Sequence, residues 1–127
     1  MANLKFGPWK SVLIDIDRAT EFSGDDVDQY SAVFDLESDY EFVTVMIPTV
    51  TSATTGVCVQ RNDAVATVPL PVYEFDDDAT GDFLHATTAA TTSHVVSFRI
   101  GGFQFGRIKM GANQAADRTF YVRGYNG

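Results

Sequence analysis

The side chains of this 127-residue chain that are suited to chemistry are seventeen carboxylates, two histidines and one cysteine. Asp76, Asp77 and Asp78 form the densest acidic run, and residues 25–28 form a second one. Carboxylate oxygens are the ligands that Ca²⁺ prefers, but neither run has the spacing of an EF-hand loop. We therefore expect an ordinary solvated acidic turn and no cofactor, with a structural Ca²⁺ at Asp76–Asp78 as the alternative.

The sequence shows no complete catalytic set. Cys58 lies in the strand-like run Gly-Val-Cys-Val-Gln, where a free thiol usually acts as a small buried hydrophobe, and only His85 and His94 could serve as its base. A lone cysteine also excludes an internal disulfide. The chain contains no Gly-x-Ser-x-Gly elbow, His-Glu-x-x-His pair or phosphate-binding loop. We therefore expect no enzymatic activity, and expect both histidines to be surface residues.

Charge is divided unequally along the chain. The formal net charge is −8, and residues 11–96 hold sixteen acidic and two basic residues, whereas residues 97–127 hold one acidic and five basic residues. An acidic total argues against direct nucleic-acid binding, which depends on Lys and Arg to neutralise phosphates. The basic end could meet an acidic surface of another protein, or its charges could simply keep the strands soluble.

The elements that must position these side chains are strands. Short runs of β-branched and aromatic residues alternate with clusters of Gly, Pro, Asp, Asn and Thr, and no long helical period is present. The pattern predicts an all-β fold, a single β-sandwich or jelly-roll-like domain of about eight strands. The expected strands are residues 12–17, 30–36, 42–47, 56–60, 67–75, 94–100, 103–110 and 119–123.

Several local features refine this prediction. Residues 98–127 are expected to form a closing β-hairpin around the polar loop 111–117, and a bulge is expected at Gly106, where the apolar parity changes. Prolines 48, 69 and 71 belong at strand ends or on an edge because they cannot donate to a ladder. The Thr- and Ala-rich stretches 49–55 and 86–93 are expected to be loops or exposed arms.

The length fits one domain, which we place at residues 11–127, preceded by an N-terminal arm at residues 1–10. Phe6 and Trp9 on this arm should either fold back on the core, which we favour, or anchor in another subunit. No run is long enough to cross a bilayer and no secretory leader is recognisable, so we expect a protein that is assembled in a host cytoplasm without a membrane partner.

A second class of function also fits an all-β domain. Exposed aromatic residues on a β-sandwich can stack on sugar rings, and Tyr73, Phe75 and Phe83 are the candidates here. The chain would then be a carbohydrate-binding module. Residues of this kind more often belong to the core of a β-sandwich.

The order of several segments resembles small all-β structural proteins of tailed bacteriophages. The segments are Tyr-Glu-Phe-Val-Thr-Val-Met-Ile-Pro at 40–48, Thr-Ser-Ala-Thr at 51–54, Val-Cys-Val-Gln at 57–60, Val-Pro-Leu-Pro-Val-Tyr-Glu-Phe-Asp at 68–76, Gly-Phe-Gln-Phe-Gly-Arg-Ile-Lys at 102–109 and Asn-Gln-Ala-Ala-Asp-Arg-Thr-Phe-Tyr-Val-Arg-Gly at 113–124. With the early apolar strand that precedes them, they extend from about residue 30 to residue 124 in family order. The segment 61–65 departs from the turn typical of these proteins, which leaves the hairpin there in doubt.

The chain is similar to capsid decoration (cement) proteins. The resemblance implies a protein on the outer surface of the virion head that clamps neighbouring capsomers. Its partners would be the major capsid protein and further copies of itself, as a homotrimer matched to three-fold lattice positions. A neck, tail or fibre component of the virion is the alternative within this class.

We assign the contact residues of such a protein from charge and expected exposure. The candidates are three residues of the arm and four basic residues of the last third: Lys5, Phe6, Trp9, Arg107, Lys109, Arg118 and Arg123.

Overall fold

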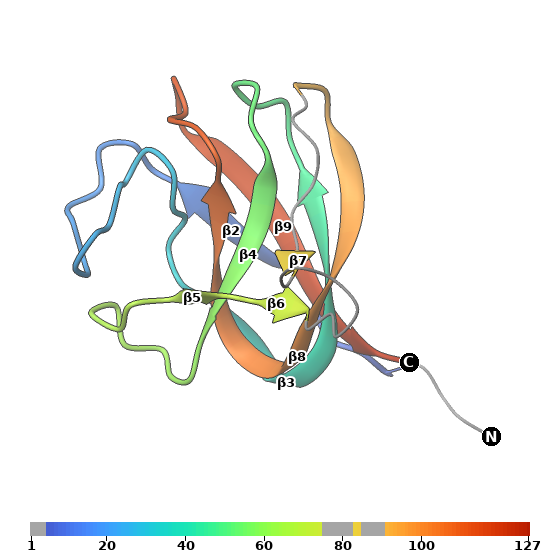
Figure 1. Ribbon diagram of the computed structural model, residues 1–127. Coiled ribbons are helices and arrows are strands. Elements are labelled where there is room, and N and C mark those ends of the chain that lie inside the picture. The colour runs from blue at the N-terminus through green and yellow to red at the C-terminus, as the bar shows by residue number, and fades with distance from the viewer. Residues whose placement is uncertain (1–4, 75–82, 85–90) are drawn as a thin grey trace.

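The structure is a computed structural model that describes residues 5–74, 83–84 and 91–127. The described residues form strands and no helix (Figure 1), so the prediction of an all-β, sandwich-like domain is confirmed. In particular, this part of the chain has no helix able to span a membrane. The strands are β1 (Lys5–Phe6), β2 (Lys10–Ile14), β3 (Phe34–Ile47), β4 (Thr55–Gln60), β5 (Leu70–Pro71), β6 (Tyr73–Glu74), β7 (Phe83–Leu84), β8 (His94–Met110) and β9 (Arg118–Asn126).

Seven strands form one antiparallel sheet in the order β1-β9-β3-β8-β4-β5, and β2 extends the β1 edge by also pairing with β9. The sheet folds back on itself where β3 and β8 bend, at the bottom of Figure 1. On β8 the bend contains Gly101 and Gly102, whose φ angles of 74° and 95° suit a residue without a Cβ. The result is two layers, one with β2, β9 and the end of β3, the other with β4 and the end of β8.

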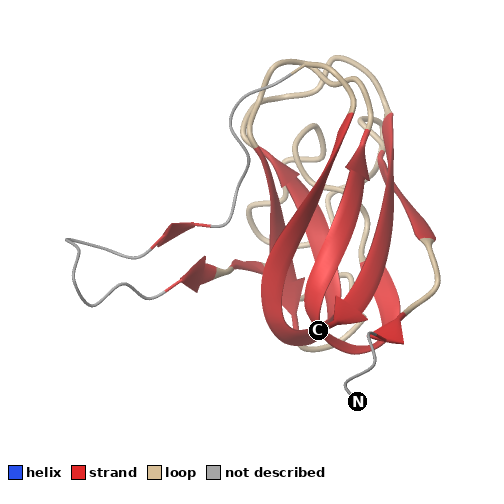
Figure 2. Ribbon diagram, turned by 90° about the vertical axis from the view of Figure 1, so that its right-hand side faces the viewer, coloured by secondary structure: helices blue, strands red, loops and turns tan. Residues whose placement is uncertain are grey.

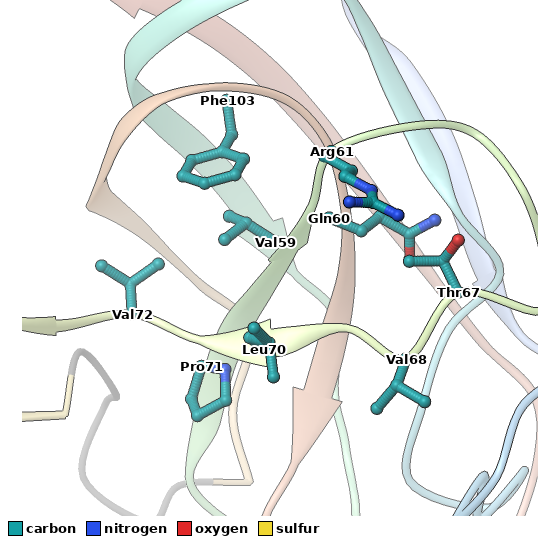
Figure 3. A pocket seen from close by; sticks show the side chains of 9 residues that line it. All are labelled: Val59, Gln60, Arg61, Thr67, Val68, Leu70, Pro71, Val72 and Phe103. Atoms are coloured by element: carbon teal, nitrogen blue, oxygen red, sulfur yellow. The ribbon is translucent and has the colours of Figure 1, made fainter.

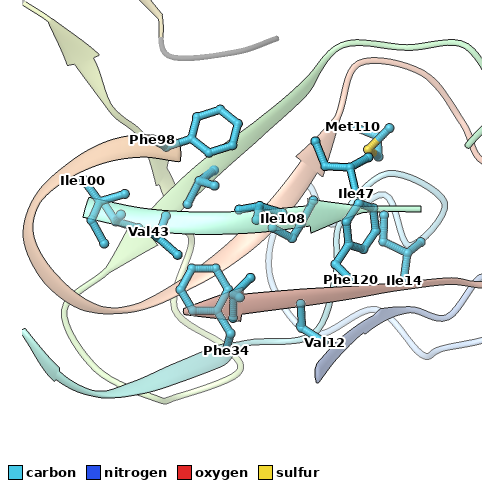
Figure 4. Close-up of a cluster of buried hydrophobic side chains, with 14 of the residues drawn as sticks. Val12, Ile14, Phe34, Val43, Ile47, Phe98, Ile100, Ile108, Met110 and Phe120 are labelled. Carbon is cyan, nitrogen blue, oxygen red and sulfur yellow. The ribbon is translucent and has the colours of Figure 1, made fainter. Parts of the chain in front are cut away.

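The core lies between these layers, as Figure 4 shows. Alternation along the strands supplies it: Val43, Val45 and Ile47 of β3 point inward together, as do Phe120 and Val122 of β9, and each is at most 2% exposed. Burying one such side chain contributes about 1.5–3 kcal/mol. This continuous core holds the two layers in register.

Residues 31 and 32 join the layers at one side. The Ser31 amide donates a hydrogen bond to the Ile108 carbonyl (2.9 Å), and the Ala32 amide donates to the Leu13 carbonyl (3.0 Å). Ser31 therefore continues the ladder of β8 while Ala32 reaches β2. These bonds anchor the long loop between β2 and β3 across the molecule.

That loop and the loop 61–69 cover the outside of the β4–β8 layer. Cys58 and Gln60 point away from the core of Val57 and Val59, yet both are buried, at 4% and 3% exposure. Phe22 from the covering loop is also buried. Within residues 5–74, 83–84 and 91–127, no comparable loop covers the outer face of β9, β3 and the start of β8, where Met46, Val95 and Tyr121 are exposed.

The structure corrects two local predictions. β8 and β9 do not form a hairpin, because β3 lies between them and the loop after Met110 carries the chain from one layer to the other. Gly106 is not at a bulge, because its register with Val59 and Phe34 is regular. A Cβ there would lie 2.5 Å from the Cys58 carbonyl oxygen, so glycine is needed for close packing.

The bounds of several strands differ from those expected from the sequence, but the class of fold is the same. The expected strands 94–100 and 103–110 are one bent strand, β8, and the expected strand 42–47 is the second half of β3. The segment that contains Pro69 and Pro71 forms a two-residue edge strand, β5, as its prolines predicted. The pair β6–β7 forms its own small sheet, which stands away from the main sheet in Figure 2.

Candidate functional site

The described part of the N-terminal arm, residues 5–10, runs along the edge of the sheet, whereas the sequence favoured an arm folded back onto the core. Lys5 and Phe6 pair with Asn126 and Tyr125 of β9. Phe6 and Trp9 nevertheless stay half exposed, at 51% and 43%. The arm is therefore part of the sheet surface and still presents large apolar side chains to solvent.

Arg123 ties this arm to β9. Its Nε donates a hydrogen bond to the Gly7 carbonyl (2.9 Å). Its guanidinium carbon lies 4.5 Å from the centroid of the Phe6 ring and 5.6 Å from that of Trp9, within the range of cation–π attraction. Four of the predicted contact residues, Lys5, Phe6, Trp9 and Arg123, thus lie together.

An aromatic row continues from the arm across the sheet. The Phe6 ring lies 5.9 Å from the Tyr125 ring, and the Tyr125 ring stacks on Phe42 at 5.0 Å with 15° between the ring planes. Register places Phe6, Tyr125 and Phe42 side by side on β1, β9 and β3. Such stacking adds to the stability of adjacent strands.

A second row of exposed apolar residues runs parallel to the first. Tyr121 of β9 pairs with Met46 of β3, and Met46 pairs with Val95 of β8. Their exposed fractions are 47%, 44% and 58%. We call the exposed apolar residues of this face the outer patch: Phe6, Trp9, Leu13, Met46, Val95 and Tyr121.

The charged residues at outward positions of this face are basic within the described segments 42–46, 95–99 and 119–125. Arg123 lies between the two rows, since it pairs with Thr44, and Arg99 pairs with Phe42. Arg99 makes an exposed ion pair with Glu41 (3.4 Å), which contributes at most about 1 kcal/mol. The outer patch is thus apolar, with Arg123 between its rows and the Arg99–Glu41 pair beside it, on a chain whose total charge is strongly negative.

Arg107 is not a surface residue, and its prediction as a contact residue is wrong. Its side chain is fully buried. One nitrogen, Nη1, donates to Glu21 Oε1 (3.0 Å) and to the Ser31 carbonyl (3.1 Å), and Nη2 donates to the Val65 carbonyl (3.0 Å). Its guanidinium also lies 4.7 Å from the Phe22 ring. Arg107 therefore holds two loops on the β4–β8 layer.

Lys109 and Arg118 lie apart from the outer patch. Lys109 is half-buried on the loop-covered layer, where its Nζ lies 4.8 Å from the Tyr30 ring and donates to Gln29 Oε1. Arg118 donates to Gln114 Oε1 (3.2 Å) and to Thr51 Oγ1 (3.1 Å). The four predicted basic residues of the last third therefore lie in three different environments: Arg107 and Lys109 on the loop-covered layer, Arg118 beside Thr51 and Gln114, and Arg123 on the outer face.

A buried ion cluster under the loop was not found from the sequence. Arg18 makes a two-pronged contact with Asp25, at 2.6 and 3.0 Å, and its Nη1 also donates to Glu21 (2.7 Å). The Asp25 side chain is fully buried. Its burial raises the pKa of the carboxyl, but hydrogen bonds from Arg18 and the Glu21 amide, with the charges of Arg18 and Arg107, lower this pKa more, so the net shift is downward.

The remaining reactive groups within the described residues include Cys58 and His94. Cys58 is buried, as predicted, and burial raises the pKa of its thiol to about 11, so it is protonated at neutral pH. The Nδ1 atom of His94 is within 2.8 Å of the Thr92 carbonyl oxygen. His85 lies outside the described residues.

The proposed Ca²⁺ ligands Asp76, Asp77 and Asp78 also lie outside the described residues. Within the part that the structure describes, no three His, Cys, Asp or Glu side chains are arranged to hold a metal ion. In the second acidic run, Asp25 is committed to Arg18, and Asp26 Oδ1 accepts a hydrogen bond from the Asp28 amide (3.1 Å).

Sequence reasoning missed four residues of the outer patch, Leu13, Met46, Val95 and Tyr121. A signal was present for Met46, because in the run 42–47 it has the parity of Thr44 and not that of the inward-facing valines. An apolar residue at an outward position of a strand is the pattern to look for.

No family model, no curated protein and no solved structure matches this chain.

Proposed function

We propose that this chain is a non-catalytic structural protein of a tailed-phage virion, of the capsid decoration type. The observation that carries the binding role is the outer patch, whose six apolar residues lie on one sheet face and are 38–58% exposed. Soluble monomers rarely expose large contiguous apolar patches, and those that do commonly use them to bind other proteins. The phage assignment rests on the resemblance of residues 30–124.

The composition of the outer patch fits a protein partner. Trp, Tyr and Arg are the residues that most often dominate binding energy at interfaces, and Trp9, Tyr121 and Arg123 lie within or beside the patch. Arg123 would favour a partner surface with acidic groups near an apolar centre. We propose the major capsid protein as that partner.

The mode of attachment follows from lattice symmetry. A protein that clamps a capsid must contact several capsid subunits, and a homotrimer on three-fold positions does this with one repeated surface. Modest contacts made by each copy then combine through multivalency. A neck, tail or fibre location would use the same kind of surface at another place in the virion.

Immunogold electron microscopy of intact virions, with antibody raised against the purified chain, tests this proposal. Label spread evenly over the heads is the expected result. Label confined to the neck or tail would reject the decoration role and leave a connector or fibre role. Virions without label would overturn the virion assignment as a whole.

A further inference from the structure

The outer face has the same order of side chains along β9 and β3. On each strand an outward polar residue lies between two outward apolar residues. Register places the members of these triplets side by side: Tyr121 with Met46, Arg123 with Thr44, and Tyr125 with Phe42. Successive outward residues of one strand are about 7 Å apart. The face is therefore a polar strip with an apolar row on either side.

The polar strip consists of Ser97, Thr44 and Arg123, and it is rich in hydrogen-bond donors. Thr44 Oγ1 and Ser97 Oγ lie 3.1 Å apart, so one hydroxyl donates to the other and the second keeps its proton for a further acceptor. Arg123 donates from Nε to the Gly7 carbonyl (2.9 Å), and its Nη1 and Nη2 atoms have no hydrogen-bond partner among the described residues. Such a set of donors suits an anionic acceptor.

The Arg123 guanidinium is held in place before any partner binds. The bond to Gly7 fixes its Nε atom, and the rings of Phe6 and Trp9 lie against the guanidinium, with centroids 4.5 and 5.6 Å from its central carbon. A guanidinium also presents its two terminal nitrogens as a planar fork that matches the two oxygens of a carboxylate. Because the fork is already oriented, pairing with a carboxylate costs less conformational entropy.

Arg123 differs from other cations of the fold in its lack of an acidic partner. Ion pairs with a carboxylate are made by Lys10, Arg18, Arg99 and Arg107. In the part of the chain that the structure describes, no carboxylate pairs with Arg123, although the chain has seventeen acidic residues. A cation kept free of acids within an apolar surface favours a partner that supplies the carboxylate.

A second apolar surface of the molecule lacks this feature. It is the groove between the end of β4, the edge strand β5 and the bend of β8, where Val68 and Leu70 are exposed (Figure 3). Arg61 is the cation beside this groove, and it lines a neighbouring pocket together with Asp39. An acid at the same pocket as the cation gives no clear preference for an anionic partner. Of these two surfaces, the outer face is the one whose charge specifies a partner.

We propose that the outer face docks a β-strand of the capsid protein that presents an apolar, an acidic and an apolar side chain in turn on one face. These side chains lie two residues apart, which is the spacing of the polar strip and its flanking rows. The acidic side chain would pair with Arg123, and the apolar ones would cover Tyr121 and Tyr125. Sheets packed face to face keep their strands nearly aligned, so the incoming strand would run along β9. The inference rests on the proposed function, because it describes how the capsid protein would bind.

Two cyclised β-hairpin peptides test the inference with purified components. One displays Leu, Glu and Leu at alternate positions on one face of a strand, and the other has Gln in place of Glu. Cyclisation reduces the cost of ordering the strand on binding. NMR titration of isotope-labelled protein measures both affinities. We expect the Glu hairpin to bind at least about tenfold more tightly than the Gln hairpin, with the largest shifts at the Arg123 Nε–H group and at Tyr121 and Tyr125.

Arg123→Gln assigns this preference to the polar strip, because the variant should bind the two hairpins with equal affinity. Arg99→Gln is the matched control: Arg99 lies on the same face but pairs with Glu41 (3.4 Å), so its loss should leave the preference unchanged. Thermal unfolding checks that each variant is folded. The inference is overturned if the Glu hairpin does not bind, if wild type binds both hairpins equally, or if the preference survives Arg123→Gln. Any of these results together with immunogold label on the heads would reject the strand and leave the decoration role standing.

Discussion

The charged residues that make ion pairs beneath the loop between β2 and β3 have side chains that are at most 24% exposed, and their role is structural. Arg18, Glu21, Asp25 and Arg107 form a connected ion cluster that fastens the loop between β2 and β3. Removing one member of a buried pair leaves its partner charged and uncompensated, which costs more than the pair contributes when intact.

We therefore expect Asp25→Asn to destabilise the protein by about 3 kcal/mol, the lower end for a broken buried ion pair. Urea denaturation at pH 7 measures the change in the free energy of unfolding. Asp17→Asn, an exposed residue of the same loop, is the control and should change it by less than about 0.5 kcal/mol. Equal effects of the two substitutions would show that the Arg18–Asp25 pair does not hold the loop.

The lowered pKa of Asp25 also predicts that the folded protein loses stability at acidic pH. The pKa of Asp25 is lower in the folded protein than its usual value of 3.8, so its stabilising contribution is present above about pH 4 and is lost as the pH falls through the lower folded value. The difference in unfolding free energy between wild type and Asp25→Asn should shrink from pH 7 to pH 3. A difference that stayed constant would contradict the assigned direction of the shift.

The fate of the basic residues shows what sequence can predict at this scale. The four basic residues of the last third, Arg107, Lys109, Arg118 and Arg123, were predicted to be exposed contact residues because charged side chains are usually exposed. Arg123 lies in the predicted surface, but Arg107 is fully buried, because loops distant in sequence supply Glu21, the Ser31 carbonyl and the Val65 carbonyl. Because these partners of Arg107 are distant in the sequence, no local pattern around Arg107 indicates that it is buried.

At the scale of elements, β8 decides the shape of the molecule. Its first half pairs with β3, its second half with β4, and two glycines at the bend let one strand serve both layers. Alternation predicted which residues form strands, but it did not predict which strands lie next to each other in the sheet. The loop 111–117 looked like a hairpin turn, and only the long-range pairing of β3 with β9 excludes this.

Gly106 is the place where β8 tolerates least change. A Cβ there would lie 2.5 Å from the Cys58 carbonyl oxygen and 2.7 Å from the Phe34 ring. Gly106→Ala should therefore destabilise the protein by about 1–3 kcal/mol, as overpacking does, lowering the melting temperature. Ser97→Ala, at an exposed position of the same strand, should be nearly neutral. A neutral Gly106→Ala would mean that β4 and β8 can separate there without cost.

At the scale of the whole molecule, the two outer faces of the sheet differ. Loops cover the outside of the β4–β8 layer, while the outer face of β9 and β3 carries the exposed outer patch. The sequence predicted the class of fold and the apolar arm, because both depend on local pattern. It could not predict that Met46, Val95 and Tyr121 would line up, because that depends on register between three strands.

The central claim is that the outer patch is the surface by which this protein binds phage heads. Co-sedimentation with purified heads that lack the protein tests it directly, using Val95→Asp in the outer patch and Val65→Asp as a matched control on a covering loop, the two valines being 58% and 50% exposed. We predict that wild type and Val65→Asp sediment with the heads, and that Val95→Asp binds at least about tenfold more weakly, because a carboxylate would be buried against an apolar partner. Equal binding by all three proteins, or no binding by wild type, would contradict the claim.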